Sequence, residues 1–251
     1  MKKSSQSFWK SNKDEDLFDY LHEVKIATLV QINRDVYGYE KFKTLYKRIA
    51  KFEKLGFLTQ SCHVAFPKQK LISLTRQGFD EFLGNGDERI IELKSDSIAH
   101  DLNLVDIRHR LLNADKVIDF FSENALQTWK KYSENTDLRP YVEARCDAAL
   151  KAQFSNGDVL LAVEYEANRK YISRIDEVVA KYYNTNDIPA VLYICSDEQI
   201  VQEHIQAENR RFSKYDARIY YKTFENFVHD QTLAFKNRDG EVLRLGNKVG
   251  E

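Results

Sequence analysis

Three acidic residues fall at the ends of two neighbouring predicted strands. Residues 144–166 predict a β-hairpin with a Ser-Asn-Gly-Asp turn between its strands. Asp147 lies near the start of the first strand, and Glu164 and Glu166 lie at the end of the second. The start of one antiparallel strand lies beside the end of its partner, and residues two apart share a face. The three carboxylates can therefore meet at one edge of a sheet.

Carboxylates held this close repel one another and raise each other's pKa, and a divalent cation removes that cost. Their hard oxygen atoms suit Mg²⁺ or Mn²⁺, so Asp147, Glu164 and Glu166 are the candidate metal ligands. The competing interpretation is a solvated hairpin end whose acidic residues are unrelated to each other.

Basic residues follow on a helix predicted over 169–183. Lys170 begins it, and Arg174 and Lys181 are seven residues apart and share one of its faces. A cation at this place could steady a phosphate or lower the pKa of an attacking water. Lys170 and Lys181 are therefore candidate catalytic residues, and Arg174 is a candidate DNA contact.

The layout of Asp147, sixteen residues, and then Glu-x-Glu with a nearby lysine is similar to the site of PD-(D/E)xK nucleases. The sequence departs from that pattern at its third position, where Glu166 stands in place of the lysine. The lysine would then be Lys181 or Lys170. The resemblance implies a mixed-sheet, restriction-endonuclease-like domain over residues 85–251.

The elements that would position these residues alternate between helices and strands. After a linker or short strand at 84–96, we expect a long helical region at 97–124, mixed strand and loop at 127–143, the hairpin, the helix at 169–183, a fully apolar strand at 190–195, a helix at 197–211, a strand at 218–223 and a final hairpin at 235–245. Antiparallel strands followed by strand–helix–strand units predict a mixed sheet of the α/β (α+β) class.

Residues 1–84 predict a winged helix-turn-helix domain. Helices are expected at 14–24, 27–36 and 39–55, followed by a hairpin and a closing helix that ends near residue 82. The third helix separates its side chains into an apolar face of Phe42, Leu45, Ile49 and Phe52 and a basic face of Lys43, Lys47, Lys51 and Lys54, with Arg48 at the flank.

This arrangement suits a helix in the major groove of DNA, with Lys68 and Lys70 on a wing near the phosphates. The competing interpretation of the lysines is an ordinary solvated helix face. The charge distribution favours DNA: residues 1–82 carry a net charge of +5 and residues 83–251 a net charge of −6, although the whole chain totals −1.

The amino-acid composition excludes several classes of protein. Hydrophobic residues make up 43% of the chain, which is enough for a core and excludes a disordered protein. The three cysteines are far apart and form no CxxC pair, so neither a disulfide scaffold nor a zinc ribbon is expected. No signal peptide or membrane-spanning segment is recognisable, so the expected location is the cytoplasm.

Several short motifs occur in a fixed order after the winged helix. They are AHDLNLVDIR at 99–108, Trp129, CDAAL at 146–150 and VEYEANRKYISRIDEVVAKYY at 163–183. In this order they resemble the replication-relaxation family of plasmid proteins and, within it, the MobC-type conjugative relaxases. The resemblance covers about residues 15–195. The family's usual proline before the aspartate is Cys146 here.

The resemblance implies roles for individual residues. His100 and Arg108 match its histidine and arginine and would hold a phosphate or the acidic cluster, whereas a lone helix histidine is more often buried and bonded to the backbone. Asp147, Glu164 and Glu166 match its acidic positions, and Lys181 and Tyr182 match its Lys-Tyr pair.

The function that the resemblance implies is that of a plasmid mobilisation relaxase, which nicks one strand of double-stranded plasmid DNA at an origin of transfer using Mg²⁺ or Mn²⁺. Other mobilisation or coupling proteins would be further partners. The chain has no H-x-H pair, so the histidine metal cluster of most relaxases is absent. The nucleophile is left open between water and one of four tyrosines, Tyr165, Tyr171, Tyr182 and Tyr183.

Two other functions fit the same residues. One is a non-catalytic winged-helix regulator of plasmid replication or transcription that carries a degenerate nuclease fold. The other is a transposon or restriction-type endonuclease. The missing lysine within the motif favours the regulator, and the presence of all three acids favours catalysis.

Overall fold

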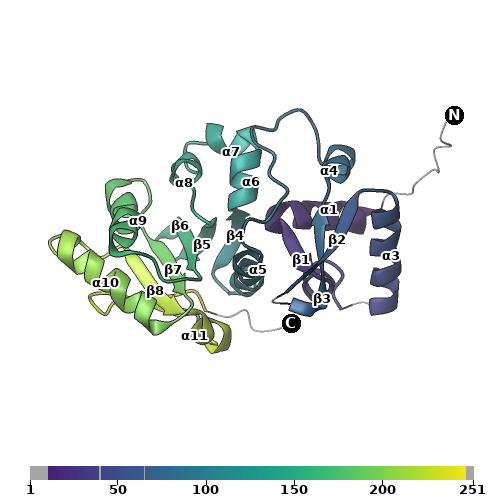
Figure 1. Ribbon diagram of the computed structural model, residues 1–251. Coiled ribbons are helices and arrows are strands. Elements are labelled where there is room, and N and C mark those ends of the chain that lie inside the picture. The colour runs from purple at the N-terminus through teal and green to yellow at the C-terminus, as the bar shows by residue number, and fades with distance from the viewer. Residues whose placement is uncertain (1–10, 40, 65, 247–251) are drawn as a thin grey trace. The chain divides into compact units, whose positions relative to one another are not determined.

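The computed structural model describes residues 11–39, 41–64 and 66–246, which divide into two compact units (Figure 1). The first unit runs up to Gly86 and includes Glu92–Asp96, and the second comprises Asp87–Ile91 and the chain from Ser97 onward. The division at Gly86/Asp87 falls two residues after the expected boundary at 84/85, in a stretch that has no helix or longer strand from residue 84 to residue 97.

The first unit consists of helices and a small antiparallel sheet. Its elements are α1 (Asn12–Val24), β1 (Ile26–Thr28), α2 (Leu29–Asp35), α3 (Phe42–Lys54), β2 (Leu58–His63), β3 (Phe66–Leu74) and α4 (Arg76–Phe82). The strand order is β1-β3-β2. Three helices followed by a hairpin and a closing helix is the predicted order, although the third helix begins at Phe42 rather than at Tyr39.

The predicted second helix, 27–36, is wrong in its first two residues. Residues 26–28 form β1, which pairs with β3 through contacts such as Ala27 with Ile72. The Thr28 hydroxyl then accepts a hydrogen bond of 3.2 Å from the Gln31 amide and caps α2. A short apolar run cannot distinguish a strand from a helix by itself, so the pairing with β3 decides it.

Helix α3 separates its faces largely as predicted. Leu45, Ile49 and Phe52 are buried, and Phe52 packs edge-on against Phe18 with their ring centroids 5.0 Å apart. Phe42 differs, because it lies in the first turn and is 50% exposed. The four lysines of the opposite face are all exposed.

The second unit is built on a seven-stranded mixed sheet in the order β10-β9-β8-β7-β6-β5-β4, so the mixed α/β class is confirmed. Its strands are β4 (Val117–Ser122), β5 (Ala148–Phe154), β6 (Gly157–Glu166), β7 (Val191–Cys195), β8 (Ile219–Thr223), β9 (Ala234–Asn237) and β10 (Val242–Arg244). Strands β6, β7 and β8 are parallel, and the other pairs are antiparallel. The fully apolar strand β7 is central, as predicted.

Helices cover both faces of this sheet. One core contains residues of α8 (Arg139–Ala144), α9 (Ile172–Asn184) and α10 (Glu198–Phe212), and the other contains residues of α5 (Ile98–Leu112) and α11 (Phe224–His229). Helices α9 and α10 lie side by side (Figure 1). Because side chains alternate along β6, Ala162 belongs to the first core and Val163 to the second.

Two predicted segments before the hairpin are wrong. The helix expected at 97–124 ends at Leu112, and residues 117–122 form the edge strand β4 beside β5. The strand and loop expected at 127–143 are instead helical, in α6 (Glu123–Thr128), α7 (Lys130–Glu134) and α8. Helices of five or six residues give too little periodicity to be recognised, and caps such as Ser122 define them.

Gly78 in α4 provides a test of the packing of the first unit. Replacing a helical glycine with alanine ordinarily stabilises a helix by about 1 kcal/mol. Here a Cβ would lie 2.2 Å from the Phe57 carbonyl oxygen and 2.9 Å from Leu74 Cδ1. We therefore expect Gly78→Ala to lower the free energy of unfolding by about 2 kcal/mol in urea denaturation, whereas Asp80→Ala, on the exposed side, changes it by less than about 1 kcal/mol. A stabilised Gly78→Ala variant would contradict this packing.

Candidate active site

The pairing of β5 with β6 places two of the predicted carboxylates opposite each other. Ala148 pairs with Val163 across the hairpin. Asp147, one residue earlier, is therefore opposite Glu164, one residue later. Their neighbours Ala149 and Ala162 face the core under α9 and α10, and side chains two residues apart share a face. Asp147 and Glu164 thus meet on the sheet face that α9 covers.

Glu164 is held by two donors from α9. The Lys181 ammonium group donates to Glu164 Oε1 at 2.8 Å, and the Tyr182 hydroxyl donates to the same oxygen. The Glu164 side chain is 14% exposed. Burial, and after it the negative charge of Asp147, raises the pKa of Glu164 to about 7, although Lys181 and Tyr182 favour its charged form. Lys181 also donates to the Ala144 carbonyl at 3.2 Å, which fixes its position.

Asp147 lies between the backbone of β6 and a histidine on α5. Its Oδ2 accepts a hydrogen bond of 2.6 Å from the Tyr165 amide and lies 3.6 Å from His100 Nε2. His100 Nε2 also donates to the Tyr165 carbonyl at 3.1 Å, and Nδ1 lies 3.2 Å from the Asp101 carboxylate. Since these partners are acceptors, the imidazole carries a proton on each nitrogen.

The charge of His100 depends on these acidic neighbours. Burial alone would lower its pKa, but the carboxylates of Asp101 and Asp147 raise it to about 10. His100 is therefore a cation at neutral pH. His100 lies beside Asp147, as its predicted role requires. It is also bonded to the backbone carbonyl of Tyr165, as the competing interpretation expected.

Glu166 lies in a different set of contacts from the other two acids. It forms an ion pair with Lys170, and the Tyr193 hydroxyl lies 3.4 Å from its Oε2. Tyr193 also contacts His204 Nε2 at 3.1 Å. Across the described ranges of the chain, no three His, Cys, Asp or Glu side chains are grouped so that they could hold a metal ion. The structure thus brings Asp147 and Glu164 together and leaves Glu166 with Lys170.

Two carboxylate oxygens remain for a metal ion. All the side-chain contacts described for Asp147 use Oδ2, and all those of Glu164 use Oε1. Asp147 Oδ1 and Glu164 Oε2 therefore have no hydrogen-bond partner among the residues that the structure describes. Two carboxylates on adjacent strands suit a divalent cation that completes its coordination with water and substrate.

The other residues predicted near the site lie elsewhere or have structural roles. Arg108 is eight residues beyond His100 on α5, which is about 80° around the helix, and its predicted role beside the acidic cluster stays a prediction. Arg174 is exposed and pairs with Glu177 at 2.9 Å. Cys146 is buried next to the site, and burial raises the pKa of its thiol. Sequence reasoning missed Asp101 and Tyr193. Tyr193 contacts Glu166 of another strand and His204 of a helix, whereas Asp101 is adjacent to His100 in the chain and could have been noted as its partner.

The predicted DNA-contacting residues of the first unit are exposed, with one exception. Lys68 and Lys70 lie on β3, and Lys70 donates to the Tyr46 hydroxyl of α3 at 3.1 Å. Arg48 instead binds both carboxylate oxygens of Asp14 on α1 and stacks over the Phe52 ring. Burial raises the pKa of Asp14, but the bonds from Arg48 and Ser11 more than offset this and hold it below its usual value. Arg48 therefore joins two helices and is removed from the DNA-contacting set.

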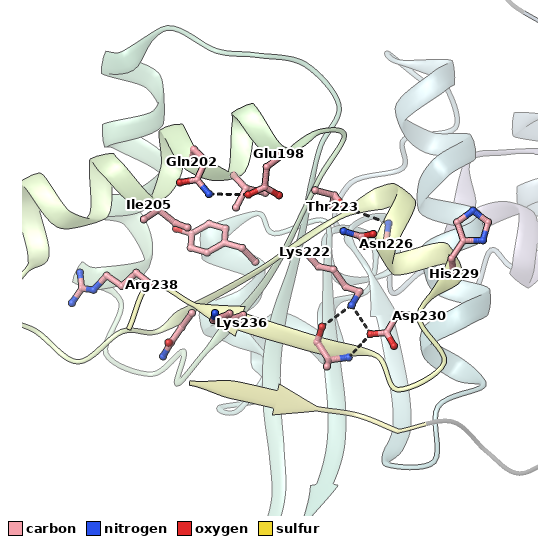
Figure 2. A pocket seen from close by; sticks show the side chains of 14 residues that line it. Glu198, Gln202, Ile205, Lys222, Thr223, Asn226, His229, Asp230, Lys236 and Arg238 are labelled. Carbon is pink, nitrogen blue, oxygen red and sulfur yellow. Dashed lines mark hydrogen bonds and ion pairs between the residues drawn. The ribbon is translucent and has the colours of Figure 1, made fainter. Parts of the chain in front are cut away.

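A larger pocket in the second unit contains none of the predicted site residues. It has a volume of about 850 Å³ and lies among α10, β8, α11 and β9 (Figure 2). Several of its polar groups are paired: Lys222 donates to Asp230 and to the Ala234 carbonyl at 2.7 Å, and Gln202 donates to Glu198 at 2.8 Å. We therefore place the candidate site at Asp147, Glu164 and Lys181.

Comparisons with protein-family models, with curated proteins and with solved structures found no match to this chain. Within the described ranges, no helix has the length and apolar character that crossing a membrane requires.

The buried charge of Glu164 gives a measurable dependence of stability on pH. Its pKa is about 7 in the folded protein and 4.5 ordinarily, so the folded state binds more protons between these values and stability falls as pH rises through them. We expect Glu164→Gln to gain about 3 kcal/mol of unfolding free energy relative to the natural protein between pH 4.5 and pH 8, measured by urea denaturation. The matched control is Glu177→Gln, at an exposed carboxylate. A Glu164→Gln difference that stays the same at both pH values would show that the carboxylate is not buried against Asp147.

Proposed function

We propose that this chain is a DNA-binding, metal-dependent endonuclease with Asp147, Glu164 and Lys181 at its centre. The observation that supports this best is the register of β5 and β6, which sets Asp147 opposite Glu164 with Lys181 2.8 Å from the glutamate. An aspartate, a glutamate and a lysine on one sheet face are the elements of the nuclease-like pattern in the sequence. The lysine comes from α9 rather than from β6.

Asp147 Oδ1 and Glu164 Oε2 are the atoms that would hold Mg²⁺ or Mn²⁺. When bound, such an ion supplies positive charge to a phosphate oxygen and lowers the pKa of a coordinated water. Burial, and after it the charge of Asp147, raises the pKa of Glu164. A bound cation would remove the repulsion between the two carboxylates, so their arrangement favours such an ion.

Three residues around the carboxylates have further proposed roles. Lys181 donates to Glu164, favours its charged form and would offset negative charge on the scissile phosphate. His100, charged through its carboxylate neighbours, lies beside Asp147, whose position is fixed by the hydrogen bond from the Tyr165 amide of β6. Tyr182 fixes one oxygen of Glu164, so its other oxygen is left for the ion.

We further propose that the enzyme is a mobilisation relaxase that nicks double-stranded plasmid DNA at an origin of transfer. The order of the motifs along the chain and the exposed lysine face of α3 support this finer assignment. Water is the proposed nucleophile. Tyr165, Tyr182 and Tyr183 already bond Asn103, Glu164 and Glu208, respectively, through their hydroxyls, which leaves only Tyr171 of the four candidate tyrosines open.

The second candidate, a non-catalytic winged-helix regulator, is favoured by one specific observation. Glu166 pairs with Lys170, so the three-carboxylate cluster expected from the sequence is not assembled in the described parts of the chain. In that case the ion pairs of both glutamates would have a purely structural role, and the chain would bind DNA without cutting it.

A nicking assay distinguishes the two functions. Supercoiled DNA with the cognate origin is incubated with the protein and Mg²⁺ or Mn²⁺. We expect nicking to be abolished in Asp147→Asn and Glu164→Gln and to fall at least about 100-fold in Lys181→Met, because these variants remove the ion's ligands and the charge beside them. Lys151→Met is the matched control and retains activity, since Lys151 pairs with Asp158 near the turn of the β5–β6 hairpin. Tight binding without nicking at any metal concentration would favour the regulator.

The lysine face of α3 predicts how DNA affinity depends on salt. Each phosphate contact contributes about −0.9 to the slope of log affinity against log salt. We expect Lys47→Ala and Lys51→Ala each to weaken duplex binding and to reduce that slope by about 1, measured by fluorescence anisotropy. Lys151→Ala, in the second unit and paired with Asp158, leaves the slope unchanged and serves as the control. Equal slopes for all of these proteins would exclude α3 as the duplex-contacting surface.

A further inference from the structure

The segment that follows β6 exposes an unusual pair of large apolar side chains. Tyr171 is 88% exposed and Ile172 is 66% exposed. Tyr171 is the N-cap of α9 and Ile172 is its first residue, a short loop after the strand that carries Glu164. They line a cleft of about 610 Å³ between α9 and α10, together with Arg169, Lys170 and Arg210. An exposed aromatic ring among cationic side chains is a surface that ordinary solubility does not explain.

Two cations of this cleft, Arg169 and Arg210, form partly exposed ion pairs, whereas Lys170 pairs with the buried Glu166. Arg169 pairs with Glu203, and Arg210 lies 2.9 Å from Asp176, with both arginines about half exposed or more. Ion pairs at such exposure contribute little to stability, so a phosphate can replace the carboxylates at small cost. A phosphate contact also gains from release of counterions, which a fixed carboxylate does not provide.

The geometry points to a single strand of DNA as the occupant, an inference that rests on the proposed endonuclease function. A tyrosine ring stacks on any unpaired base, whereas bases in a duplex are already stacked on each other. Tyr171 precedes Lys181 by ten residues on α9, which is about 15 Å. A strand bound at the site would therefore pass the ring within a few nucleotides of the phosphate beside Lys181. We propose that Tyr171, Arg169 and Arg210 bind the DNA strand next to the nick in single-stranded form.

The test measures binding without cleavage, so that it does not depend on catalysis. The full chain with Asp147→Asn is mixed in EDTA with a fluorescent oligothymidylate of about 15 nucleotides. Adding Tyr171→Ala is expected to weaken binding about tenfold, and Tyr171→Phe restores it because the ring is kept. Affinity for a duplex of the same length changes by less than about twofold, since α3 provides that contact. Tyr215→Ala is the control: it is also exposed but packs on Tyr183 and Phe212, at the far ends of α9 and α10.

The possible results separate this proposal from the proposed function. Unchanged oligothymidylate affinity in Tyr171→Ala, or an equal loss in Tyr215→Ala, would overturn the single-strand site. A selective loss in Tyr171→Ala supports it even if the natural protein fails to nick. A protein–DNA adduct that disappears in Tyr171→Phe would instead make Tyr171 the nucleophile, and would overturn its assignment as a stacking residue.

Discussion

The second unit depends on two carboxylates that face each other across one pair of antiparallel strands. Pairing Ala148 with Val163 forces Asp147 and Glu164 onto the same face at opposite positions. Two like charges in a poorly solvated place are unfavourable, which is expressed in the raised pKa of Glu164. The neighbouring helices provide the side chains that reduce this repulsion.

The side chains that contact the two carboxylates come from helices on opposite faces of the sheet. Helix α9 presents Lys181 and Tyr182 to Glu164, and helix α5 presents His100, charged by Asp101, to Asp147. The two groups stabilise the ionised carboxylates only in part, and the remaining repulsion favours a bound cation. Buried carboxylates that repel each other lower the stability of a fold, and such groups with shifted pKa values are typical of functional sites.

A buried polar network extends from the neighbouring glutamate. Glu166 contacts Tyr193, and Tyr193 contacts His204, which is bonded to the Ile200 carbonyl. Burial lowers the pKa of His204, so this histidine is neutral near neutral pH, in contrast to His100. Two histidines of one unit thus differ in charge because one faces carboxylates and the other faces a phenol and a carbonyl.

Much of the architecture followed from the sequence, and the reasons are local. The strong 3.6-residue periodicity of α3 and α9 and the apolar run of β7 predict their structures because each pattern is set by neighbours along the chain. The short helices α6 to α8 and the strands β1 and β4 were not recognised, because caps and distant strand partners define them.

The sequence by itself determined which side chains could form the candidate site: the types and spacing of Asp147, Glu164 and the nearby lysines. Only the tertiary structure decided how they are grouped. Helix α9 crosses the sheet so that Lys181 pairs with Glu164, and the contact with α1 pairs Arg48 with Asp14. These choices depend on residues far apart in the chain that the fold brings within hydrogen-bond distance, and spacing along the sequence carries no information about them.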